Sequence, residues 1–330
     1  MRSPTSPLGA SRLAALALAC AAAATGCGNY STEDIRFYEA LPTRPDLRIE
    51  VPLSDAVAAG ATPAGEACTL GSADPWVQAK ATSDGINASV DWLVGLVDAV
   101  RRFPPTTRLD DGRIWGPFDD DKHPGVRITI SINRTTLADG RLEHVYRFQA
   151  TRPADQAPAV YTVLSGTFHG PSATHGEGTL VLDFDEIHRA GMQDADTPHG
   201  RMDVAYDRTV DPRTIDLEVA TAGAFGLVQQ FNYQFEGHRD GRGRFLYRFQ
   251  KPAAGGSDVI TVSASFAADG AGRGRMAFQA AAGATGTFHQ CWNAAACLTW
   301  LDDPAGYSCG GFVPCTAGAE SACPAVDPPL

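Results

Sequence analysis

The densest carboxylate group in this chain is a run of three aspartates. Asp119, Asp120 and Asp121 come just before His123. Consecutive carboxylates in a loop can supply the several oxygen ligands that Ca²⁺ requires. The run lacks the alternating spacing of a calcium-binding loop, so we interpret it as a solvated turn.

A second group of carboxylates surrounds Asp183. Asp183 and Asp185 alternate along a predicted strand, and His188 follows them. Two carboxylates on one strand face can act as acid and base or bind a cation, which makes a hydrolase one hypothesis for this chain. A strand face that is simply exposed to water has the same pattern, and we favour that interpretation.

Other patterns that carry chemistry are weaker. His169 and His175 flank a loop, but no two histidines have the spacing that places both imidazoles on one side of an element. Ser165-Gly166 lacks the Gly-x-Ser-x-Gly elbow of hydrolases. The glycines from Gly270 to Gly274 lie at a hairpin end and not between a strand and a helix. The sequence therefore predicts no catalytic residue, metal site or cofactor.

Segments with a period of two follow one another along most of the chain. Val126, Ile128 and Ile130 point to one side of a predicted strand, while Arg127 and Thr129 point to the other. Such strands cover about eleven segments: 126–132, 143–151, 160–168, 178–184, 200–206, 215–221, 227–235, 244–250, 259–266, 273–279 and 286–291. Short turn signals separate them, which favours an antiparallel sheet built from hairpins.

The strand series contains two matching halves. Asp139-Gly140-Arg141 followed by Tyr146-Arg147-Phe148-Gln149 recurs as Asp240-Gly241-Arg242 followed by Tyr247-Arg248-Phe249-Gln250, an offset of 101 residues. We infer a duplicated β-meander over 126–207 and 227–290. The predicted fold is all-β: an antiparallel meander of about eleven strands, duplicated, and curled as a barrel or half-barrel that removes exposed edges, with one packed α-helix.

Four aromatic residues share one face of the matching strands: Tyr146, Phe148, Tyr247 and Phe249. Arg147 and Arg248 point to the opposite face. The aromatic face is most simply part of the core. In a half-barrel the same four residues can also face an apolar ligand.

One segment before the strands has helical spacing. Apolar residues recur there at intervals of three and four: Ile86, Val90, Leu93, Val94 and Val97. Ser83 is the expected amino cap, and Pro104-Pro105 ends the helix near Phe103. The wide apolar face predicts a helix packed against the sheet.

The amino terminus has the three-part layout of a secretory signal peptide. Arg2 and Arg12 precede an apolar run from Leu13 to Ala24, which is too short to remain as a membrane-spanning helix. Ala24-Thr25-Gly26-Cys27 follows. These small residues before a cysteine resemble the lipobox of bacterial lipoproteins, over about the first thirty residues.

The resemblance implies cleavage before Cys27, acylation of its sulfur and anchoring of the chain in the cell envelope. Gly28 in place of aspartate favours an outer membrane in a cell that has one. Lipidation at Cys20 and an ordinary secretory signal without lipid are the alternatives. The expected sheet is also similar in architecture to half-barrel lipoproteins and carriers of the lipoprotein-localisation type, over about Ser83 to Cys291, although its helix precedes the sheet.

Cysteine content and charge agree with export. Beyond Cys20 and Cys27, six cysteines remain, an even number that suits three disulfides with pairing left open: Cys68, Cys291, Cys297, Cys309, Cys315 and Cys323. Cys68 has no cysteine near it and is expected to join the tail. Without the signal peptide, 25 Lys and Arg stand against 38 Asp and Glu, a formal charge of −13 that argues against a nucleic-acid partner.

These observations divide the chain into four parts. They are a signal peptide (1–26), a lipid anchor and tether (27–72), a β domain with an amino-terminal helix (73–290), and a cysteine-rich tail (291–330). We hypothesise a non-enzymatic envelope lipoprotein, held to a membrane by its lipid, that binds a partner protein or has a structural role. The alternative is a carrier of a lipid or other apolar ligand, and a hydrolase is the third hypothesis.

Overall fold

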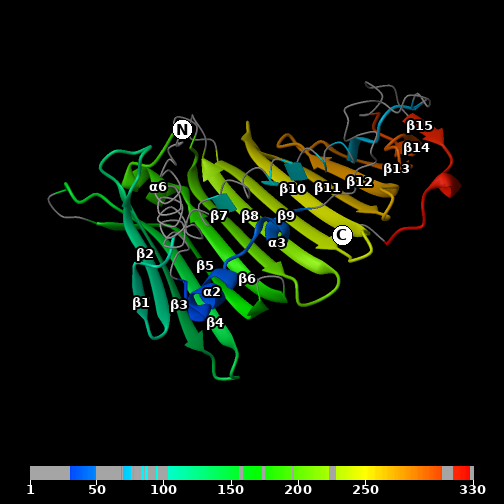
Figure 1. Cartoon of the computed structure of the whole chain (residues 1–330). Helices are drawn as coiled ribbons and strands as arrows, with labels where there is room; N and C mark the ends of the chain where they lie inside the picture. The colour runs from blue at the N-terminus through cyan, green and yellow to red at the C-terminus, as the bar shows by residue number, and fades with distance from the viewer. Residues whose placement is uncertain are drawn as a thin grey trace, which may run out of the picture.

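One antiparallel sheet forms most of the molecule, as seen in a computed structural model of the chain (Figure 1). The structure describes residues 30–49, 68, 70–75, 77, 80, 83–84, 86–87, 94–95, 103–155, 159–172, 175–194, 197–222, 228–306 and 315–327. Its strands are β1 (Thr107–Leu109), β2 (Gly112–Asp119), β3 (Arg127–Thr136), β4 (Leu142–Thr151), β5 (Val160–Ser172), β6 (His175–Asp183), β7 (His199–Asp207), β8 (Arg213–Ala222), β9 (Val228–Gly237), β10 (Gly243–Ala253), β11 (Gly256–Phe266), β12 (Gly272–Gln279), β13 (Thr285–Trp292), β14 (Leu298–Asp303) and β15 (Cys315–Gly318). Its helices are α2 (Thr32–Glu39), α3 (Arg44–Leu47), α6 (Phe184–Ala190) and the short 3-10 helix η1 (Glu320–Ala322).

Strand order in the sheet is the same as strand order in the sequence, from β1 to β15. The predicted antiparallel meander is confirmed, and all the predicted segments from 126 to 291 are strands, β3 to β13. The prediction of a barrel or half-barrel is wrong: the sheet is not strongly curled, and among the described strands β1 pairs with β2 alone and β15 with β14 alone. The two edge strands have three and four residues, so each exposes little backbone, and short edges protect an open sheet without closure.

Apolar side chains gather on one face of the sheet and form the core. One register row on this face contains Ile132, Tyr146, Leu180, Val204, Leu217 and Tyr233, each at most 4% exposed. A single sheet face cannot exclude water by itself and needs a second layer. Helices α2 and α3 lie over this face and provide part of that layer (Figure 1).

Residues 30–49 differ from the loose tether that the composition predicts. Phe37, Leu41 and Leu47 are at most 1% exposed and belong to the core. Leu47 ends helix α3, so this part of the predicted tether is helical. The missed signal is a capping box: Ser31 accepts a hydrogen bond from Asp34 N (3.1 Å) and donates its own N–H to the Asp34 carboxylate (2.9 Å).

A buried ion cluster fastens α2 to the start of the sheet. Asp34 is fully buried, and its carboxylate accepts hydrogen bonds from Arg113 Nε (2.6 Å) and Arg108 Nη2 (3.0 Å). Burial alone would raise the pKa of Asp34, but hydrogen bonds from Arg108, Ser31 and Arg113 hold it well below its ordinary value. The Arg113 guanidinium also lies 4.7 Å from the Phe37 ring centroid.

Part of the predicted helix from Ser83 to Phe103 is described. Ser83, Asp84, Ile86, Asn87, Val94 and Gly95 are helical, and the other positions up to Arg102 lie outside the described residues. Ile86 and Val94 are buried, which agrees with packing on the sheet. Ser83 is itself helical and buried, and its hydroxyl lies 3.3 Å from the Tyr233 hydroxyl, so it contacts the sheet rather than preceding the helix as a cap.

Two disulfides between described residues hold the carboxyl-terminal region. Cys68 pairs with Cys297, the predicted link between the segment before the helix and the tail, and Cys291 pairs with Cys323. Cys315 is also disulfide-bonded, and Cys309 lies outside the described residues. The tail adds β14 and β15 to the sheet, so it is a continuation of the β domain and not only a crosslinked extension.

Glycine at 166 makes room for a buried tyrosine on the neighbouring strand. A Cβ atom on Gly166 would overlap the Tyr146 ring and the Thr179 carbonyl, to which Tyr146 donates a 2.7 Å hydrogen bond. We expect Gly166→Ala to lower the free energy of unfolding by about 2 kcal/mol through overpacking. Urea unfolding measures this. Gly95→Ala, at an open helical position, is the control and should not destabilise, and equal losses in the two variants would contradict the packing argument.

Within the described part of the chain, no helix has both the length and the apolar character needed to cross a bilayer.

Candidate interaction surface

The face of the sheet opposite the core carries a continuous row of mainly polar side chains. The pairing register aligns one residue from each strand between β3 and β13: Ser131, Arg147, Ser165, Val181, Asp203, Glu218, Asn232, Arg248, Thr261, Ala277 and Thr287. We call this set the polar row. With neighbouring strands about 4.8 Å apart, the row is roughly 48 Å long. This length suits an extended partner better than a small molecule.

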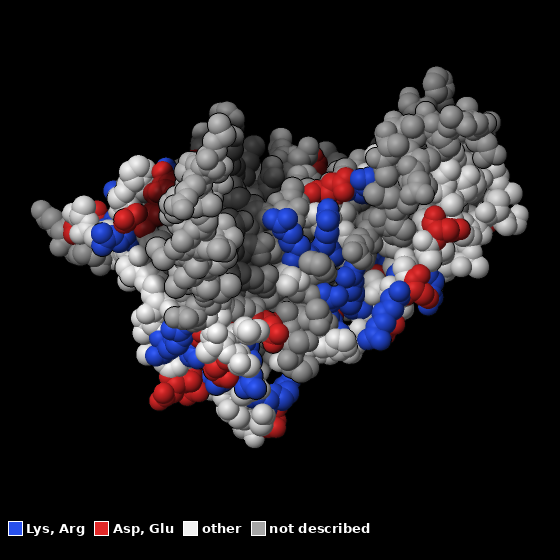
Figure 2. Space-filling view, in the orientation of Figure 1, with Lys and Arg blue, Asp and Glu red and all other residues white. Residues whose placement is uncertain are grey.

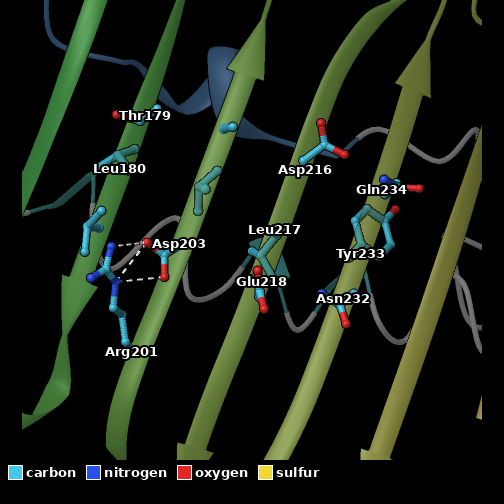
Figure 3. Close-up of a pocket in the computed structure, with 13 residues that line it drawn as sticks. Thr179, Leu180, Arg201, Asp203, Asp216, Leu217, Glu218, Asn232, Tyr233 and Gln234 are labelled. Carbon is cyan, nitrogen blue, oxygen red and sulfur yellow. Dashed lines mark hydrogen bonds and ion pairs between the residues drawn. The ribbon is translucent and has the colours of Figure 1, made fainter. Parts of the chain in front are cut away.

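Shallow hollows follow the polar row. One hollow of about 600 Å³ lies over β6 to β9 and includes Asp203, Asp216 and Glu218 (Figure 3). A second, of about 560 Å³, lies over β10 to β13 and begins at Arg248, which pairs in register with Asn232 of the first. A third of about 410 Å³ shares its Arg201 wall with the first. The hollows therefore adjoin one another along the sheet.

Five charged side chains on this face are exposed and have no charged or hydrogen-bonding partner among the described residues: Arg147, Asp216, Glu218, Arg248 and Arg275. Figure 3 shows Asp216 and Glu218 apart from the ion pair that Arg201 makes with Asp203. Glu218 stands directly opposite Asp203 in the register. Arg201 already pairs with the Asp203 carboxylate, whereas Glu218 has no such partner among the described residues.

Unlike the exposed charges on the sheet face, these charged side chains in the hairpin turns form ion pairs within the molecule. Arg141 pairs with Asp139 (2.7 Å), and Arg242 pairs with Asp240 (2.8 Å). These hydrogen bonds lower the pKa of Asp139 and of Asp240, with the largest effects from the Arg141 N–H and the Arg242 side chain respectively. Basic and acidic groups lie side by side along the lower rim in Figure 2. The charges of Arg141 and Arg242 are therefore compensated within their own turns.

The two matching sequence halves place their Asp-Gly-Arg motifs in equivalent turns. Gly140 and Gly241 both have a φ near +85° to +89°, which favours glycine, and each donates to the carbonyl three residues earlier. The turn around Asp269-Gly270 has the same hydrogen bonds without belonging to the match. Because turn chemistry alone selects this dipeptide, the duplication stays a prediction.

The aspartate groups singled out from the sequence have structural partners. Asp120 lies 2.8 Å from His123 Nδ1, and Asp119 pairs with Arg127. Asp183 ends β6 and caps α6 by accepting from Glu186 N (2.9 Å), so its predicted strand face shared with Asp185 is wrong. The helix begins there because the cap and the acidic first turn favour it over continued strand.

The histidines and the repeat aromatics occupy separate places. His169 pairs with Glu143 (3.2 Å), and His199 pairs with Asp185 (2.9 Å) while its ring stacks on His188. Tyr146 and Phe148 are at most 2% exposed and fill the core, while Tyr247 and Phe249 are half-buried. In the described part of the chain, no group of three or more His, Cys, Asp or Glu residues is arranged to bind a metal ion.

Arg147 and Arg248 lie on the face away from the core aromatics, as the period of two predicts, whereas Asp216 and Glu218 were not among the predicted residues. Both acids alternate with buried Ile215 and Leu217, which is the signal that could have found them. Comparisons of the chain with protein families, with curated proteins and with solved structures found no match.

Proposed function

We propose that this chain is a non-enzymatic envelope lipoprotein, anchored through Cys27, whose polar row binds an extended segment of another envelope protein. The observation that carries the proposal is the set of exposed charges without internal partners on one sheet face. Arg147 and Arg248 lie on either side of the acids Glu218 and Asp216. A partner with complementary charges would pair with these exposed side chains and fix the register of binding.

The anchor is supported by the lipobox resemblance and by the disulfides that the structure contains, because stable disulfides form in oxidising compartments. The interaction role is supported by the shape of the sheet. One face is covered by α2 and α3 (Figure 1), whereas the opposite face is exposed at Arg147, Glu218 and Arg248. The tail covers the opposite face near β13, where Cys291 bonds to Cys323. A broad shallow surface suits a protein contact, whereas small ligands occupy deeper, more enclosed and more apolar sites.

Photocrosslinking in cells that produce the full chain tests the proposal. We expect p-benzoylphenylalanine in place of exposed Asn232, on the polar row, to give one discrete higher-mass adduct with a protein. The same residue in place of Ala138, exposed in the β3–β4 turn, should not give that adduct. Adding Glu218→Lys should reduce the adduct at 232 about tenfold or more, because it reverses a charge that the partner recognises.

Asp110→Lys is the matched control for that substitution, because Asp110 is an exposed acid in the β1–β2 turn. It should leave the adduct at 232 unchanged. Equal adducts from positions 138 and 232, or an adduct that survives Glu218→Lys in full, would show that the polar row is not the binding surface.

A further inference from the structure

An aromatic patch lies where the described chain begins. The Tyr30 and Tyr38 rings are 5.4 Å apart, and the Tyr38 hydroxyl donates a 2.6 Å hydrogen bond to the Phe103 carbonyl. The Phe103 ring lies 6.0 Å from the Phe118 ring. Ile35 precedes Tyr38 by three residues and is its neighbour on the helix surface. These five residues, Tyr30, Ile35, Tyr38, Phe103 and Phe118, are called the aromatic patch below.

Two members of the aromatic patch are large apolar side chains left in contact with solvent. Phe103 is 54% exposed and Ile35 is 47% exposed. Arg36, beside Ile35, has a side chain that is 65% exposed. Aromatic rings with a nearby arginine are typical of protein surfaces that lie at the headgroup level of a bilayer.

With Cys27 acylated, chain connectivity would bring this patch close to the bilayer. Cys27 precedes Tyr30 by three residues, and three extended residues span at most roughly 11 Å. Tyr30 directly precedes Ser31, which caps α2, and α2 is fixed to the sheet by the Asp34 ion cluster. An acylated Cys27 would therefore hold the patch close to the membrane, because no long tether separates the two.

We propose that the aromatic patch lies against the headgroup region of the bilayer that holds the acyl chains of Cys27. This inference rests on the proposed lipid anchor and adds an orientation to it. The patch belongs to α2 and its surroundings, on the covered side of the sheet, whereas the polar row lies on the opposite face. Contact through the patch therefore leaves the polar row free for a protein partner.

Crosslinking to lipid tests the orientation. The full chain, purified from membranes and placed in vesicles of dioleoylphosphatidylcholine and dioleoylphosphatidylglycerol, carries p-benzoylphenylalanine in place of Phe103. Because Phe103 contacts Tyr38 through its carbonyl, this replacement keeps that hydrogen bond. We expect at least tenfold more lipid adduct, by mass spectrometry, than from the same residue at Val210, which is 50% exposed in the β7–β8 turn.

The intact mass of the same samples separates the two ways in which the inference can fail. Protein without an acyl group would overturn the anchor and the orientation together. Acylated protein that gives equal lipid adducts at positions 103 and 210, or a protein adduct in place of lipid at 103, would overturn the orientation alone. Circular dichroism of both variants confirms that each is folded.

Discussion

Replacing Asp34 with asparagine is expected to lower the free energy of unfolding by about 3–5 kcal/mol, the usual effect of removing one partner from a buried ion pair. Arg113 is 5% exposed and would lose its carboxylate partner, and Arg108 would lose the same contact. Urea unfolding under non-reducing conditions measures the change. The loss should appear with a rise in the mobility of residues 30–49, measured by hydrogen exchange.

Asp110→Asn is the matched control, because Asp110 is exposed. Its free energy of unfolding should stay within about 0.5 kcal/mol of that of the parent. Adding Arg113→Met to Asp34→Asn should recover part of the loss, because it removes the uncompensated guanidinium.

The lowered pKa of Asp34 also determines the direction in which pH changes stability. Its ionised form stabilises the fold above its ordinary pKa of 3.8, and that stabilisation is lost as the pH falls below this value. An Asp34→Asn variant as stable as the control would show that the cluster does not fasten α2.

Acidification from pH 7.5 to 5 is expected to cost the parent protein about 2 kcal/mol through His144 alone. His144 is 5% exposed and packs between Phe37 and Phe168, and neither ring nitrogen has a hydrogen-bond partner in the described part of the structure. Burial, followed by the charge of Arg134, lowers the pKa of His144 from 6.5 to about 4. In the unfolded chain His144 therefore binds a proton below about pH 6.5, whereas in the folded chain it does so only below about pH 4. The free energy of unfolding falls as the pH is lowered across that interval.

His144→Phe should remove this part of the acid sensitivity, because phenylalanine keeps the aromatic packing and does not titrate. The difference in unfolding free energy between variant and parent should grow by about 2 kcal/mol between pH 7.5 and pH 5. His175→Gln, at an exposed position at the start of β6, serves as the control and should keep the slope of the parent. A parallel pH profile for His144→Phe and the parent would contradict a buried, neutral imidazole.

Alternation predicted the central strands well because most of them have one buried face and one face exposed to solvent. In β8, Ile215 and Leu217 are buried while Asp216 and Glu218 are exposed, which is the pattern that a period of two detects. The same rule missed β2, where the register shifts between Trp115 and Phe118 and interrupts the alternation. It also missed β15, whose four residues are too few to show a period.

Closure and docking depend on contacts that no local pattern encodes. The sequence contains enough strands for a barrel, but only the register shows that β1 and β15 do not meet. The Asp34 cluster joins residues 74 and 79 positions apart, so its carboxylate looked like an ordinary surface acid. The unpaired charges on the polar row were likewise hidden, because their isolation depends on which side chains stand beside them across the strands.

The strict neighbour-to-neighbour order of the meander has a consequence for how such a protein can change over evolutionary time. In the sheet that the structure describes, each strand pairs with the strands directly before and after it in the chain. Gain or loss of one complete hairpin would keep the alternating direction and every remaining pairing. Insertions and deletions in the gene can therefore change the width of the sheet. Each hairpin of two strands would lengthen or shorten the exposed face by roughly 10 Å.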